Sequence, residues 1–261
     1  LAITGTSSFT TSANNATIAL DTTTNAFTGA VTITTNDDSG TDADVTIDNG
    51  TTALILAAST IDGDLTLTSG HASGITDSGT VTVGGNLAAT TDANNGLINL
   101  GTLAVDGTVA LATHGNGAAT VVNDAGMNFA ASTVGGNLVA TATTGNMTDS
   151  GALAVSGTSS FTTSANNATI VLDTTTNAFA GAVTITTNDD SGTDADVTID
   201  NGTTALVLAA STIDGDLTLT SGNASGITDS GTVTVGGNLL ATTDANNGVI
   251  NLGTLAVDGT V

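Results

Sequence analysis

The chain has 261 residues and a formal net charge of −24, and it contains no Lys, Arg, Pro, Cys, Trp or Tyr. Because it has no cation to neutralise phosphates, we exclude nucleic acid as a direct partner, and anionic membrane surfaces would repel it. Disulfides are excluded as well, and no apolar run approaches the ~18 residues of a membrane-spanning helix, so we expect no membrane insertion. Strong helix formers such as Glu and Lys are missing while Thr, Val and Ile abound, which favours β structure.

Short apolar–polar alternations occur along the whole chain and predict short strands. One group comprises Val31-Thr32-Ile33, Val45-Thr46-Ile47 and Leu54-Ile55-Leu56. A second comprises Val81-Thr82-Val83, Asn86-Leu87-Ala88-Ala89 and Leu97-Ile98-Asn99-Leu100. Each group is interrupted by polar, Gly-rich turns, so each predicts three strands in one coil. We expect the apolar residues of these strands, with Phe9, Phe161, Met127 and Met147, to form the core.

A long tandem repeat dominates the sequence. Residues 1–109 recur as residues 153–261, an offset of 152, with only eight differences. Within one period a strand followed by Gly recurs six times, so we divide the 152 residues into six coils of about 25 residues. This gives a six-coil repeat at 1–152 and a partial second copy at 153–261 that continues the first. The second copy stops inside the repeat, so we expect the natural chain to be longer.

Strands this short cannot form a sheet alone, but coils stacked on one another make parallel sheets around a shared interior. The missing prolines agree with strands that must all donate ladder hydrogen bonds. The pattern therefore predicts an all-β solenoid of about ten three-strand coils. The glycines next to Asn86, Asn137 and Asn238 are expected to form turns, and these asparagines could stack as an amide ladder.

Several phrases resemble the β-helical repeats of filamentous-haemagglutinin-like giant bacterial surface adhesins. They are Val83-Gly84-Gly85-Asn86-Leu87, Val134-Gly135-Gly136-Asn137-Leu138 and Thr76-Asp77-Ser78-Gly79 with the strand that follows it. The resemblance implies a right-handed parallel β-helix that is secreted and displayed at the cell surface. It therefore implies an extracellular or cell-surface location.

The densest acidic cluster is the strongest candidate for a metal site. Ca²⁺ binds six to eight oxygens, and Asp-rich loops with Gly and Asn supply them. The candidate ligands are Asp37, Asp38, Asp42, Asp44 and Asp48, with Asp189, Asp190, Asp194, Asp196 and Asp200 in the second copy. The spacing is not that of an EF-hand, and solvated turns with local Asp hydrogen bonds remain the alternative.

Other polar residues have structural interpretations. His71 is replaced by Asn223 in the second copy and His114 lies in a loop, so both are expected to be solvated turn residues. Asn15, Asn49 and Asn146 begin glycosylation sequons, which arise easily by chance in a chain rich in Asn and Thr. There is no basic side chain for lyase chemistry. Paired Asp could serve glycoside hydrolysis, but each recurs in both copies as a scaffold residue would, so we expect no catalytic site.

Three classes of function remain open. The preferred one is a structural or adhesive segment that forms or extends a surface fibre by coil stacking, with other copies of itself and divalent cations as partners. The alternative is a glycan- or surface-binding module with Thr- and Asp-rich faces. Its Thr-x-Thr runs do not recur at one fixed place in every coil, which argues against a flat ice-binding face. A lyase-like enzyme is the third.

Overall fold

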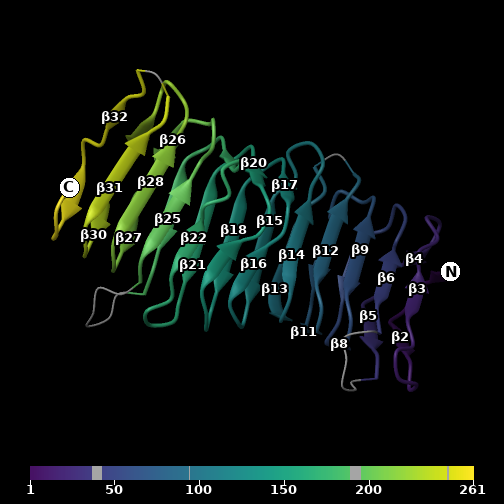
Figure 1. Ribbon diagram of the computed structural model, residues 1–261. Coiled ribbons are helices and arrows are strands. Elements are labelled where there is room, and N and C mark those ends of the chain that lie inside the picture. The colour runs from purple at the N-terminus through teal and green to yellow at the C-terminus, as the bar shows by residue number, and fades with distance from the viewer. Residues whose placement is uncertain (37–42, 94, 189–194, 246) are drawn as a thin grey trace. The chain divides into compact units, whose positions relative to one another are not determined.

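A computed structural model describes residues 1–36, 43–93, 95–188, 195–245 and 247–261 (Figure 1). In these ranges every regular element is a strand, and no helix is present that could cross a membrane. All the strand pairs described below are parallel. The chain is a parallel β-solenoid of about 11 turns, which confirms the predicted fold class with one turn more than expected.

The chain divides into two compact units, which are described separately. The first contains Leu1–Ala125 with Val134–Gly136, and the second contains Gly126–Thr133 with Asn137–Val261. The strands of residues 1–125 are β1 (Ala2–Ile3), β2 (Ser7–Thr10), β3 (Ile18–Leu20), β4 (Ala26–Phe27), β5 (Val31–Thr34), β6 (Val45–Asp48), β7 (Leu54–Leu56), β8 (Ser59–Ile61), β9 (Leu65–Ser69), β10 (Ile75–Asp77), β11 (Val81–Val83), β12 (Leu87–Thr91), β13 (Ile98–Val105), β14 (Thr108–Ala112) and β15 (Ala119–Asn123).

The later strands complete the first period and, from β20 onward, repeat this order. They are β16 (Met127–Phe129), β17 (Ser132–Val134), β18 (Leu138–Ala142), β19 (Met147–Asp149), β20 (Leu153–Val155), β21 (Ser159–Thr163), β22 (Ile170–Leu172), β23 (Ala178–Phe179), β24 (Val183–Thr186), β25 (Val197–Asp200), β26 (Leu206–Leu208), β27 (Ser211–Ile213), β28 (Leu217–Ser221), β29 (Ile227–Asp229), β30 (Val233–Val235), β31 (Leu239–Thr243), β32 (Ile250–Asn251) and β33 (Leu255–Val257).

Inward-pointing side chains stack in columns along each unit. In the first unit Ile18, Val45, Leu65, Leu87 and Val109 face one another on successive strands β3, β6, β9, β12 and β14. All five are buried, while the residue that follows each of them, threonine at Thr46 and Thr66 and alanine in the other three, points outward. Because side chains alternate along a strand, in-register stacking keeps every apolar column in the core. The sequence alternation is therefore confirmed as an inside–outside pattern.

Three strands per turn are also confirmed, with one difference at a corner. β7, β8 and β9 make one turn, and they pair with β10, β11 and β12 of the next. β13, however, pairs with both β10 and β11, because it runs through the corner that separates those two strands. Two of the three strand rows therefore merge into one continuous sheet at this turn.

Buried asparagine side chains form hydrogen bonds with the strand backbone at places where no neighbouring strand supplies them. Asn49 is fully buried, and its Oδ1 accepts a hydrogen bond from the backbone N–H of Phe27 at 2.7 Å. Its Nδ2 donates to the carbonyl oxygens of Phe27 at 3.1 Å and Ala53 at 2.8 Å. The side-chain amide thus takes the place of a backbone peptide beside Phe27. Gly50 follows in the left-handed conformation, with φ of 54°, which closes the turn.

The same arrangement recurs in the second unit. Asn201 bonds both the N–H and the carbonyl of Phe179. Asn123 bonds both backbone groups of Val105 in the first unit. Sequence analysis considered Asn49 only as a sequon and did not predict this buried role. The sequence Asp-Asn-Gly directly after a strand could have indicated the role of Asn49 and Asn201, but Asn123 is followed by Asp and lacks this signal.

Most of the predicted core residues are buried. Phe161 is fully buried and packs edge-on against Phe179, with ring centroids 5.3 Å apart. Met127 and Met147 are buried and stack in register. Phe9 is only half-buried, because its strand β2 belongs to the first turn, although its ring still contacts Phe27 edge-on at 5.6 Å. The prediction of a core position is therefore confirmed for Phe161, whereas Phe9 is less buried than that prediction implies.

Candidate functional site: polar corners and an apolar end

The structure only partly covers the predicted calcium ligands. Asp37, Asp38, Asp42, Asp189, Asp190 and Asp194 lie outside the described residues. Asp44 Oδ1 accepts the backbone N–H of Asp64 at 2.9 Å, and Asp48 Oδ1 accepts that of Gly50 at 2.8 Å. Asp196 and Asp200 do the same in the second copy. Over the described residues, no group of three or more His, Cys, Asp or Glu side chains is placed to hold a metal ion.

One corner of the solenoid carries a ladder of side chains that links successive turns. Asp44 binds the backbone of Asp64, and Asp64 Oδ1 accepts both the backbone N–H of Asn86 at 2.7 Å and its Nδ2 at 3.1 Å. Asn86 Oδ1 then accepts the N–H of Thr108 at 2.9 Å and its hydroxyl at 2.8 Å. The predicted asparagine stack is thus a mixed Asp–Asn–Thr ladder. Asp196, Asp216, Asn238 and Thr260 repeat it.

The three Thr-Asp-Ser-Gly phrases form a second clamp between turns. Asp77 Oδ1 accepts the N–H of Gly101 at 3.0 Å, and its Oδ2 accepts both the N–H and the hydroxyl of Thr102 at 2.7 Å. The neighbouring Ser78 hydroxyl donates backward to the carbonyl of Leu56 at 3.1 Å. A single motif therefore holds the turn before it and the turn after it.

The second unit contains two further copies of this clamp. Asp149 accepts N–H groups of the following turn. Asp229 accepts those of Gly253 and Thr254, each at 2.8 Å. The hydroxyl of Thr254, with the N–H of Gly253, holds the pKa of Asp229 below its ordinary value of 3.8, because these donors favour the charged carboxylate.

Both histidines lie in turns, as predicted. His71 Nδ1 accepts the N–H of Ser73 at 3.0 Å, and its replacement Asn223 makes the same bond to Ser225 through Oδ1 at 2.9 Å. The imidazole therefore acts as a turn acceptor that an amide can replace. His114 is exposed.

The three predicted sequons differ in exposure. Asn15 is exposed at a turn with φ of 58°, and Asn146 is exposed but bonds the N–H of Thr169. Asn49 is buried with its amide fully engaged.

Outward threonines form in-register rows that the sequence analysis did not anticipate. Thr10, Thr34, Thr60 and Thr82 oppose one another on successive strands of the first unit. In the second unit the row comprises Thr141, Thr162, Thr186, Thr212 and Thr234. The rows end at Ala104 and Ala256. Threonines therefore do recur at one fixed place over several turns, although the Thr-x-Thr runs show no constant spacing in the sequence. The loops between the strands differ in length, so the register cannot be read from that spacing.

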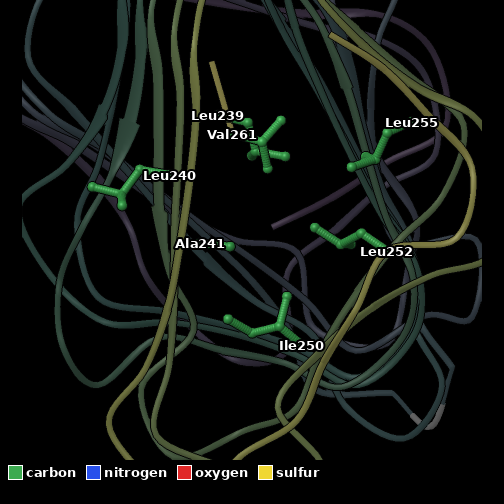
Figure 2. Close-up of a pocket in the computed structure, with 7 residues that line it drawn as sticks. All are labelled: Leu239, Leu240, Ala241, Ile250, Leu252, Leu255 and Val261. Atoms are coloured by element: carbon green, nitrogen blue, oxygen red, sulfur yellow. The ribbon is translucent and has the colours of Figure 1, made fainter.

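The last turn of the second unit carries an apolar hollow. It is lined by Leu239, Leu240, Ala241, Ile250, Leu252, Leu255 and Val261, and its volume is about 330 Å³ (Figure 2). Figure 2 shows Ile250 and Leu252 of one segment and Val261 of another around the same open space. We call the end of β31, β32 and β33 with this hollow the end face.

The tandem repeat contains a natural control for the end face. Ile98, which corresponds to Ile250, is 1% exposed in the first unit, whereas Ile250 is 48% exposed. In the first unit β15 covers this position, with Ala119 opposite Ile98 and Val121 opposite Leu100. In the described part of the chain no strand lies over β32 in this way. The same sequence is thus buried or exposed according to whether a further turn covers it.

Comparison with known proteins gives one match. A family model described as repeats of unknown function (DUF5649) matches residues 1–34, 42–111, 116–186 and 194–261. Each 152-residue period therefore contains two family repeats of roughly 70 residues, a subdivision that the sequence analysis missed. No curated protein and no solved structure matches the chain.

Proposed function

The chain belongs to the DUF5649 repeat family, and from this premise we propose that it is a structural segment of an extracellular repeat protein. In this proposal it forms or extends a surface fibre by the stacking of solenoid turns. The adhesin-like phrases support the cell-surface part of the proposal. The structural part rests on the contacts of the polar side chains.

The observation that carries the proposal is the use of corner side chains as links between turns. Asp44, Asp64 and Asn86 each bind backbone N–H groups of the next turn, and so does Asp77. Charge-assisted hydrogen bonds from carboxylate to backbone N–H are about twice as strong as neutral ones. They fix each turn on its neighbour, as a spacer that must resist unstacking requires. A carboxylate engaged in this way is a poor candidate for an acid or base that must exchange protons with a substrate.

The location and the structural role can be tested directly. Cells that produce the protein would be labelled with an antibody against residues 1–261, before and after external protease treatment. We expect surface label that the protease removes, and label confined to the cell interior would refute the proposal. In parallel, the protein would be incubated with a panel of polysaccharides. Turnover that is lost on substitution of one Asp would replace the structural function with an enzymatic one.

Divalent cations are proposed partners through the acidic surface. With a net charge of −24, copies repel one another over about 8 Å at physiological ionic strength. Ca²⁺ should therefore promote association of copies. Removing it with a chelator at constant ionic strength should reverse the effect. If neither association nor thermal stability changes, the Asp residues only solubilise the surface, and calcium is not a partner.

A second candidate function is glycan binding on the threonine row of the second unit. Thr186, Thr212 and Thr234 are exposed and lie on consecutive turns. Strands about 4.8 Å apart give a regular series of hydroxyls that could face a polymer of regular repeat. The test is binding to insoluble glycans by the triple Thr→Val variant of this row. A matched variant carries Thr→Val at Thr218, an outward residue of a different strand row. Equal binding by both variants would exclude the row as the binding face.

A further inference from the structure

An asparagine that precedes glycine is prone to spontaneous deamidation, because glycine has no side chain to keep its amide nitrogen away from the asparagine side chain. The chain contains this pair five times, at Asn49, Asn95, Asn116, Asn201 and Asn247. The structure holds these asparagines in different ways, so they should differ in reactivity.

The buried pairs are protected. Asn49 and Asn201 are both fully buried. The amide of Asn49 accepts one hydrogen bond and donates two, and the N–H of Gly50 donates to Asp48 Oδ1 at 2.8 Å. The glycine nitrogen and the asparagine amide carbon cannot react without loss of these bonds.

The exposed Asn95 is held more loosely. It lies in the left-handed conformation with φ of 64°, and its Oδ1 accepts the backbone N–H of Asn116 at 2.8 Å. The N–H of Gly96 donates to the carbonyl of Ala93 at 2.9 Å. One hydrogen bond therefore still fixes the reacting amide, and a second fixes the glycine nitrogen.

Asn116 is the least restrained of the asparagines in the first unit that precede glycine. It is exposed in the turn between β14 and β15, and its side chain forms no hydrogen bond to any residue that the structure describes. The N–H of Gly117 makes only a long bond, of 3.2 Å, to the carbonyl of His114. A further turn already lies over this corner, since the N–H of Gly136 donates to the carbonyl of Gly117 at 2.8 Å. The exposure of Asn116 is therefore not a consequence of a chain end.

We propose that Asn116-Gly117 is a site of spontaneous deamidation and backbone isomerisation. The Gly117 nitrogen loses its proton and attacks Asn116 Cγ, the Cγ–Nδ2 bond breaks, and ammonia leaves with a proton, which gives a cyclic imide. Water then opens the imide at either carbonyl. The products are aspartate and isoaspartate, in which the main chain runs through Cβ and Cγ. Water is the only other reactant, and this modification goes beyond the proposed structural function.

Isoaspartate at this position should loosen the corner, because it adds a methylene group to a closely packed backbone. The Asn116 carbonyl oxygen lies so close to Gly136 that a Cβ there would clash with it. A longer main chain cannot keep both the bond from Asn116 N–H to Asn95 Oδ1 and the bond from Gly136 N–H to the Gly117 carbonyl. The modified turn would therefore mark aged molecules by a new charge and a weakened contact between turns.

The experiment incubates the 261-residue chain at mildly alkaline pH, either folded or in denaturant. Thermolysin peptides are weighed at intervals, since the chain has no Lys or Arg for trypsin, and isoaspartate is detected by enzymatic methylation. In the folded chain Asn116 should convert about tenfold faster than Asn95, which must break one ordinary hydrogen bond more, and about a thousandfold faster than Asn49, which must break three. In denaturant the three rates should become similar.

Two variants separate the chemistry from its consequence. Asn116→Gln should abolish the modification at this site and leave the other sites unchanged, because glutamine closes a larger ring far more slowly. Asn116→Asp adds the charge without the longer backbone, so the Gly136 amide should keep its protection from hydrogen exchange in this variant and lose it in the isoaspartate form.

Equal rates at Asn95 and Asn116 in the folded chain would overturn the inference, and so would an unmodified Asn116 in a folded chain whose denatured form converts. An isoaspartate form that protects Gly136 as well as the fresh chain would refute the predicted loosening.

Discussion

The buried amide of Asn49 gives the most direct test of how the turns are held together. Asn49→Ala removes the acceptor for Phe27 N–H and the donor to the carbonyls of Phe27 and Ala53. An unpaired buried polar group costs about 1–3 kcal/mol, so three such groups predict a loss of about 3–6 kcal/mol if water reaches only part of the cavity. That is a large part of the ~5–15 kcal/mol that stabilises a typical domain.

The assay is native-state hydrogen exchange at the Phe27 amide, supported by denaturant unfolding. Exchange reports the local turn even if the solenoid does not unfold in two states. Asn49→Asp is a sharper variant, because it keeps the shape and the acceptor for Phe27 N–H but places a carboxylate oxygen against the two carbonyls. The control is Asn99→Ala, since Asn99 is an exposed asparagine in a strand of the same unit. A loss below about 1 kcal/mol for Asn49→Ala, or an Asn49→Asp variant as stable as the unmodified chain, would refute the reasoning.

Three further predictions concern the core, a turn and the acid response. Phe161→Ala should cost about 3–5 kcal/mol in denaturant unfolding and Phe9→Ala distinctly less, because only the former ring is fully buried; equal costs would contradict the assignment. His71→Asn should leave stability within about 0.5 kcal/mol, since the second copy already uses asparagine there, while His71→Ala should cost about 1 kcal/mol by removing a turn acceptor. For Asp229 the folded pKa is depressed, so its contribution to stability is present above the ordinary value of 3.8 and is lost as the pH falls through the depressed one. The protection of the Thr254 amide from hydrogen exchange, relative to the intrinsic rate at the same pH, should therefore fall below about pH 4, and Asp229→Asn should remove that acid dependence.

The strands were predictable because apolar–polar alternation is a local property. Val81-Thr82-Val83 carries it within three residues, and the structure buries both valines and exposes the threonine. The parallel arrangement followed from the same runs, because connections of a few residues between short strands exclude ordinary crossovers. The burial of Phe9 was not predictable in this way. It depends on whether a neighbouring turn covers the residue. Phe9 and Phe161 have the same local sequence, so that sequence alone cannot predict different burial for the two rings.

Contacts between turns were the hardest to foresee, because loops of unequal length separate their partners. Asp77 and Thr102 of the clamp lie 25 positions apart, and Asp44 and Asp64 of the corner ladder lie 20 apart, so no single spacing in the sequence connects partners on neighbouring turns. Buried asparagines such as Asn49 look like ordinary turn residues in sequence, since Asn before Gly is common in exposed turns. The Asp-rich cluster falls largely outside the described residues, so the calcium prediction stays a prediction.

The clamp made by each Thr-Asp-Ser-Gly phrase also affects how the number of repeats in such a protein can change during evolution. Asp77 and Ser78 reach one turn ahead and one turn back, and their contacts extend no further. Unequal recombination between the near-identical copies would insert or remove 152 residues in register. At the new junction each residue would meet neighbours of nearly the same sequence as before. Such an array can lengthen or shorten by whole periods without a new contact having to evolve, and lineages of this protein should differ in copy number more readily than in the sequence of a turn.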